Sequence, residues 1–76
     1  MNIRDIAQQV CNSLEGFYGP TEINECHAYG LLQTGLADND DACLALALPD
    51  ALDILQAFGC EDVDALQSML HVATAG

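Results

Sequence analysis

The sequence has almost no positive charge, no tryptophan and no long apolar run. Arg4 is its single Lys or Arg, against twelve acidic residues in a chain of 76, so the formal net charge is −11. Proteins bind DNA, RNA and anionic lipid through Lys and Arg, so this chain would be repelled by all three. No apolar stretch approaches the roughly 18 residues of a membrane-spanning helix. We therefore expect neither nucleic acid nor membrane as a direct partner, and a Lys/Arg-rich protein surface as the complement.

Motifs for catalysis or metal binding are also scarce. The first residues, Met-Asn-Ile-Arg-Asp, lack the basic and apolar segments of a signal peptide, and we expect a cytoplasmic protein. No Cys-x-x-Cys pair occurs among the four cysteines, which are Cys11, Cys26, Cys43 and Cys60. Buried apolar thiols are favoured over a zinc site or disulfides. Cysteine catalysis with His27 or His71 is disfavoured, because negative surroundings raise a thiol pKa. We expect no cofactor, no metal and no enzymatic activity.

The composition is that of one folded domain. Hydrophobic residues make up 51% of the chain and the mean hydropathy is +0.20, which is too apolar for a disordered acidic tail. A chain of 76 residues lies near the lower end of what folds alone. Every helix must then contribute to one shared core.

Apolar residues recur at steps of three and four, which is typical of amphipathic helices. The first such stripe, from Ile3 to Phe17, predicts a helix over about residues 2–15 with Asn2 as its N-cap and Gly16 at its end. A second helix is predicted over about 21–34, ending at Gly35, with His27 near its inner face.

The second half of the chain predicts further helices over about 42–48, 49–58 and 61–73. Pro49 suits a first helical position, and Asp38 with Asp41 is typical of a capping arrangement before the 42–48 segment. The sequence therefore predicts an all-α fold, a compact bundle of four to five short helices. Most of the core is expected from the first helix, Leu44–Leu48 and the last two helices.

Eight of the twelve acids are concentrated in one part of the chain. They are Asp38, Asp40, Asp41, Asp50, Asp53, Glu61, Asp62 and Asp64. Many of them fall in first helical turns, where the helix dipole favours negative charge. The same dipole favours Lys and Arg in last turns, and the sequence offers none after Arg4. Helix capping therefore explains the positions of the acidic residues, but it does not explain the near absence of Lys and Arg.

The spacing of these acids suggests a use for the charge. Asp50 and Asp53 share an outward helical face, as do Glu61 and Asp64, and such residues have Cβ atoms about 5–6 Å apart. Successive phosphates of a DNA strand rise about 3.4 Å along the axis, so a row of carboxylates can imitate a phosphate track. A calcium loop starting at Asp38 is excluded, because Cys43 and Pro49 stand where Gly and Glu are required.

In length, in acidity and in these eight carboxylates, the chain resembles the small acidic phage-encoded inhibitors that include anti-CRISPR proteins and other DNA mimics. The resemblance is one of type and involves no shared motif. It implies a non-enzymatic inhibitor that occupies the basic nucleic-acid channel of a host defence complex, such as a CRISPR effector or another nucleic-acid-binding complex, or blocks its assembly.

Two other classes share features with the chain. Acyl carrier proteins are similar in length, acidity and helix count, but their Asp-Ser-Leu motif near mid-chain is missing, since the one Ser-Leu pair is Ser13-Leu14. The segment from Thr34 to Leu55 loosely resembles a ubiquitin-associated domain. That resemblance implies a helical adaptor with Leu36 as the hydrophobic loop residue. In this alternative, an apolar patch including Phe17, Tyr18 and Leu36 mediates partner binding or homodimerisation, and the charge serves only solubility.

Overall fold

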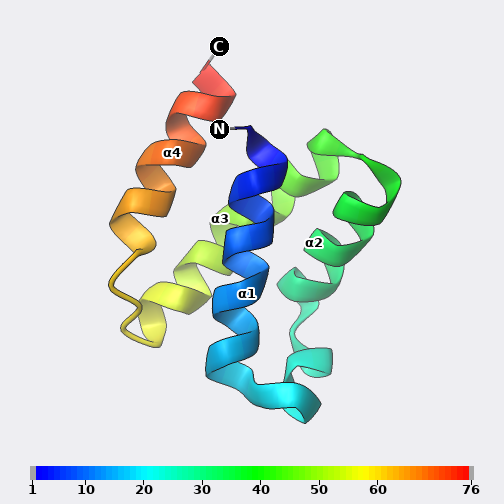
Figure 1. The fold of residues 1–76 in the computed structure, drawn as a ribbon, viewed down its shortest axis with the longest axis vertical. Coiled ribbons are helices and arrows are strands. Elements are labelled where there is room, and N and C mark those ends of the chain that lie inside the picture. Colours follow the sequence, from blue (N-terminus) through cyan, green and yellow to red (C-terminus); the bar gives the residue numbers. More distant parts are fainter. Residues whose placement is uncertain (1, 76) are drawn as a thin grey trace.

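Four α-helices and one short 3-10 helix account for nearly all of the chain (Figure 1). A computed structural model describes residues 2–75, and no strand occurs in that range. The elements are α1 (Ile3–Glu22), η1 (Ile23–Glu25), α2 (His27–Asp38), α3 (Asp41–Ala57) and α4 (Val63–Ala75). The prediction of an all-α bundle with four to five helices is confirmed.

The helices form a compact but flattened body in which α3 contacts each of the other three helices. The radius of gyration is 11.3 Å, close to the value of about 11.4 Å expected for a globular chain of this length. The extents are 36 × 28 × 16 Å. In Figure 1, which looks down the shortest axis, α3 crosses behind α1, with α2 and α4 on opposite sides.

The first helix begins where the sequence predicts and continues further than expected. The Asn2 side chain accepts a hydrogen bond from the Asp5 backbone N–H at 3.0 Å, and the Asn2 N–H donates to the Asp5 carboxylate. The helix does not end at Gly16. It continues to a kink at Gly19, whose φ of 83° suits glycine, and then resumes as far as Glu22. Because Gly16 keeps a helical backbone, residues 16–20, which lie between the two helices predicted from sequence, are helical except for this kink.

The second predicted helix is shifted. Residues 23–25 form η1, and α2 starts only at His27 and runs past Gly35 to Asp38. Asn39, in the left-handed region with φ 52°, ends it. Gly35 is buried in α2 because it packs against Leu44 of α3: a Cβ at this position would lie 2.8 Å from a Leu44 methyl carbon. Its role is close helix packing rather than helix termination. His27 is exposed, which contradicts its predicted inward position.

The segments predicted as two helices, 42–48 and 49–58, are one helix, α3, with Pro49 inside it. Pro49 lies on the exposed side of the helix, and because proline lacks a backbone N–H, one helical hydrogen bond is lost there. The buried residues before and after it lie on one face, so burial keeps the helix continuous. Asp40, not Asp38, is the N-cap, because its carboxylate accepts the Cys43 N–H at 3.1 Å; Asp38 is the last residue of α2.

The core is built entirely from apolar side chains, and no buried polar or charged residue occurs in the described range 2–75. Its largest fully buried members are Ile6, Val10, Cys11, Leu14, Leu32, Leu44, Leu48, Leu52 and Leu55. α1 and α3 supply most of them, while α4 adds Val63 and Leu66. No helix within residues 2–75 is both long and apolar enough to cross a membrane.

Candidate functional site

The acidic residues all reach the surface, but they do not form one row. Every one of the twelve carboxylate side chains belongs to an exposed residue. Of the eight predicted binding residues, Asp38, Asp40 and Asp41 lie at the corner between α2 and α3, and Glu61, Asp62 and Asp64 lie at the turn between α3 and α4. Asp50 and Asp53 lie between these groups on the exposed side of α3. Since α3 has 17 residues, at about 1.5 Å per residue the two outer groups are separated by roughly 25 Å.

The α2–α3 corner uses its carboxylates within the fold. Asp40 caps α3, as described above, and its backbone N–H donates to the Gly35 carbonyl at 2.9 Å. Asp41 accepts a hydrogen bond from the Arg4 guanidinium at 3.0 Å, which ties the start of α3 to the start of α1. The single Lys or Arg of the chain is therefore engaged here. Two of the three corner acids stabilise structure.

The α3–α4 turn differs, because its carboxylates have no such task. Within residues 2–75, the side chains of Glu61, Asp62 and Asp64 make no hydrogen bond or ion pair. Gly59, with φ 82°, reverses the chain after α3, and the Leu66 N–H donates to the Asp62 carbonyl at 2.9 Å as α4 starts. Glu61 and Asp62 thereby lie in a short turn with their charged groups exposed.

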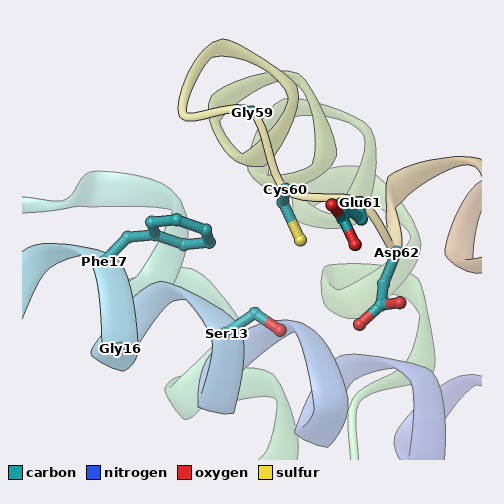
Figure 2. Close-up of a pocket in the computed structure, with 7 residues that line it drawn as sticks. All are labelled: Ser13, Gly16, Phe17, Gly59, Cys60, Glu61 and Asp62. Carbon is teal, nitrogen blue, oxygen red and sulfur yellow. The ribbon is translucent and has the colours of Figure 1, made fainter.

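A cleft of about 580 Å³ separates this turn from α1 (Figure 2). Ser13, Gly16 and Phe17 of α1 form one side, and residues 59–62 form the other. Figure 2 shows the Cys60 sulfur and the Asp62 carboxylate pointing toward α1, where the Ser13 hydroxyl and the Phe17 ring face them. The cleft therefore combines an aromatic wall with two carboxylates, a hydroxyl and a thiol. Its volume lies within the usual range for ligand pockets, about 300–1,000 Å³.

Three of the four aromatic rings in the chain meet at this end of the molecule. Phe17 stacks on Phe58 with ring centroids 5.1 Å apart and an interplanar angle of 13°. Tyr18 meets Phe58 edge-on, also at 5.1 Å, with an angle of 78°. Phe17 remains 44% exposed and Phe58 45% exposed. The stack is therefore a partly open aromatic surface beside the cleft rather than part of the core.

The predicted apolar patch of Phe17, Tyr18 and Leu36 is not assembled. Phe17 stacks beyond the end of α3, whereas Leu36 is half-buried in the last turn of α2, beside the start of α3. The length of α3 separates them. Phe58 takes the place of Leu36 in the apolar surface.

Two of the four thiols predicted to be buried, Cys11 and Cys26, are buried, and the other two are only partly so. Burial, followed by the nearby Glu15 charge, raises the pKa of Cys11 to about 11, although Gln33 opposes this by hydrogen bonding. Cys43 and Cys60 are half-buried; the Cys43 thiol donates to the Leu31 carbonyl at 3.5 Å. Burial and the neighbouring Cys26 raise the pKa of Tyr18. The environment of Cys11 therefore favours a neutral thiol.

The structure brings together no arrangement typical of metal binding or nucleophilic catalysis in the part of the chain that it describes. Residues 2–75 contain no cluster of three or more His, Cys, Asp or Glu able to hold a metal ion. No histidine lines the cleft, so neither Ser13 nor Cys60 has a neighbouring imidazole base. His27 and His71 line two other hollows, at the start of α2 and between α3 and α4.

Sequence reasoning missed Ser13 and Cys60, which line the cleft, and Phe58, which stacks on Phe17 beside it. A signal for the rings was present: Phe17 follows Leu14 by three residues, and Phe58 follows Leu55 by three. Each aromatic thus extends an apolar stripe past the last buried residue of its helix. An aromatic at that position lies where the bundle ends and is only half covered.

The comparisons with known proteins identify no relative. No family model matches the chain, and neither a curated protein nor a solved structure matches it.

Proposed function

We propose that this chain is a non-enzymatic acidic inhibitor, which binds the basic nucleic-acid-binding surface of another protein or complex and competes with nucleic acid there. The observation that carries the proposal is the exposure of all twelve carboxylates in a chain whose single Lys or Arg already pairs with Asp41. An uncompensated charge of −11 opposes folding through self-repulsion. Binding to a cationic surface relieves that repulsion.

The partner class follows from the charge. Proteins that hold DNA or RNA present Lys and Arg to phosphates, and their affinity depends on releasing counterions. A rigid body carrying carboxylates can occupy the same groove. By the resemblance in type to phage-encoded inhibitors, the target is a CRISPR effector or another nucleic-acid-binding complex in the cytoplasm of a host cell, and the chain is phage-derived.

The exposed side of α3 and the α3–α4 turn carry the contacts in this proposal. Asp50, Asp53, Glu61, Asp62 and Asp64 make no hydrogen bond or ion pair within the described residues 2–75. Asp40 and Asp41 are engaged within the fold and contribute mainly to the long-range field. The contact surface is thus narrower than the eight residues predicted from sequence.

A second candidate function is a helical adaptor that binds through apolar side chains, with charge serving solubility. The half-exposed stack of Phe17 and Phe58 favours it. Ionic strength separates the two functions, since exposed charges are screened over about 8 Å at 0.15 M salt whereas apolar contacts are not.

The decisive experiment starts from host lysate passed over the immobilised protein and eluted with a sodium chloride gradient. The purified partner is then loaded with a fluorescent DNA or RNA duplex, and its release is followed as the acidic protein is added. We expect elution at moderate salt and release of the duplex, both abolished by Asp50→Lys with Asp53→Lys. A partner retained in 1 M salt, or one that keeps its nucleic acid, would favour the adaptor.

A further inference from the structure

Three features meet at one end of the molecule and nowhere else among residues 2–75: stacked aromatic rings, an adjoining cleft, and unengaged carboxylates. The chain has four aromatic residues, and the Phe17–Phe58–Tyr18 group leaves two of them nearly half exposed. The other strongly exposed large hydrophobics, Leu46 and Val72, are single aliphatic side chains on α3 and α4. Aromatic surface left open beside a cleft commonly marks a contact site.

The cleft offers two kinds of interaction over a short span. The Phe17 ring forms part of its α1 side. Across from it, the carboxylates of Glu61 and Asp62 lie in the short turn after Gly59, with the Asp62 group directed toward Ser13 (Figure 2). A group that fills this cleft must therefore present a flat or apolar surface to the ring and hydrogen-bond donors with positive charge to the turn.

We propose that this cleft receives an arginine side chain of the basic protein partner. A guanidinium is planar, stacks on aromatic faces and donates paired N–H bonds to carboxylates. The lysine ammonium is a compact, strongly hydrated charge that can bind the carboxylates of the turn but offers no flat surface to the ring. The inference rests on the proposed function and deepens it, because it names the anchor of the acidic surface and the residue type that the anchor selects.

A second copy of this chain fits the cleft poorly. Homodimerisation through the aromatic stack would bring two chains of net charge −11 together, and like charges at an interface oppose association. The acidic turn beside the stack would then face the acidic turn or helix of its partner. Charge complementarity thus favours a basic occupant over self-association.

The test uses the full chain and two synthetic twelve-residue peptides of equal charge, one with arginine and one with lysine at every basic position. Backbone amide shifts in two-dimensional NMR spectra locate the binding site, and titration in 50 mM salt gives the affinities. We expect the shifts of the arginine peptide to concentrate at residues 13–17 and 58–62. Its affinity should exceed that of the lysine peptide by about five-fold, the scale of a cation–π contact.

Two variant comparisons separate the cleft from general charge. Glu61→Gln with Asp62→Asn and the control Glu25→Gln with Asp38→Asn remove the same charge, and the control residues are exposed and lie outside the proposed contact surface. The first pair should lower arginine-peptide affinity by about ten-fold, as expected for a lost charge-assisted contact, and the control pair much less. Phe17→Leu keeps an apolar side chain but removes the ring face, so the arginine-over-lysine ratio should fall to about one. Circular dichroism checks that each variant is folded.

The outcomes distinguish the two proposals. If both peptides bind equally and the shifts spread along α3, the arginine cleft is wrong while the acidic inhibitor survives. If neither peptide binds in 50 mM salt, the proposed function fails as well. If the shifts at Phe17 and Phe58 vary with protein concentration alone, and sedimentation shows dimers, the stack is a self-interface and the inference is overturned.

Discussion

The two ends of α3 carry the same residue type and use it differently. At the α2–α3 corner, the Asp40 carboxylate caps α3 and the Asp41 carboxylate binds Arg4, and Gly35 packs tightly against Leu44. At the α3–α4 turn, the carboxylates of Glu61 and Asp62 have no partner within residues 2–75, and they border an open cleft. The residue type and the spacing of an acidic side chain in this protein therefore do not determine its role. What its carboxylate touches decides between structure and binding.

Glycine-to-alanine substitutions should give the largest difference between the two ends. At Gly35, an added methyl carbon would lie 2.8 Å from Leu44, so we expect Gly35→Ala to lower the free energy of unfolding by about 1–2 kcal/mol through overpacking. At Gly16, which lines the cleft, an added Cβ meets nothing within 4 Å, so Gly16→Ala should raise it by about 0.5–1 kcal/mol through helix propensity. Urea denaturation measures both. Equal effects would mean that the corner is not tightly packed.

Removing single carboxylates should give the next largest effect. Asp40→Ala leaves the Cys43 N–H without its cap and should cost about 1 kcal/mol of stability. Asp62→Ala should change stability by less than about 0.5 kcal/mol, as is usual at surface positions. Thermal unfolding followed by circular dichroism compares them. A large loss in Asp62→Ala would show that the turn also has a structural task.

The half-buried thiols at the two ends should react at different rates. The Cys43 thiol donates to the Leu31 carbonyl, whereas the Cys60 sulfur points into the open cleft (Figure 2). We expect N-ethylmaleimide, which is uncharged, to modify Cys60 before Cys43 and Cys11 last, because burial raises the pKa of Cys11 to about 11. Mass spectrometry of partly modified protein reads the order. Modification of Cys43 first would contradict the openness of the cleft.

The raised pKa of Cys11 also makes the stability of the fold depend on pH. The Cys11 thiol has a pKa near 9.0 when unfolded and about 11 when folded, so the unfolded chain loses its proton first as pH rises. The contribution of Cys11 to stability should therefore be constant below pH 9 and fall between about pH 9 and 11. Cys11→Ala should reduce this slope in denaturation curves measured over that range, although the variant also loses core volume.

The ion pair at the corner should have the smallest effect. Arg4 and Asp41 are 47% and 57% exposed, with their side chains 3.0 Å apart, so solvent screens the pair. Arg4→Gln should lower stability by at most about 0.5 kcal/mol in low salt and by less in 0.5 M salt. A loss much above that limit would mean that the pair is a main link between α1 and α3.

The sequence was a good guide to local structure and a poor guide to helix ends. Steps of three and four apolar residues correctly placed the inner face of α1 as far as Leu14, and Asn2 marked the first N-cap. Pro49 and Gly35 were misread as helix boundaries. Both residues weaken an isolated helix, but burial on either side of Pro49, and the close approach of Leu44 to Gly35, override that preference.

In the candidate site too, some properties follow from the sequence alone and others only from how the helices pack. Composition by itself determined the all-α class, the charge of −11 and hence the class of partner proposed, because these properties depend only on which residues are present and on their periodicity. Only the tertiary structure decided that Phe17 meets Phe58, that a cleft opens beside them, and that the acids of the turn stay unengaged while Asp40 and Asp41 of the corner do not. Those facts depend on contacts between residues about forty positions apart, which the packing of helices fixes and local pattern does not.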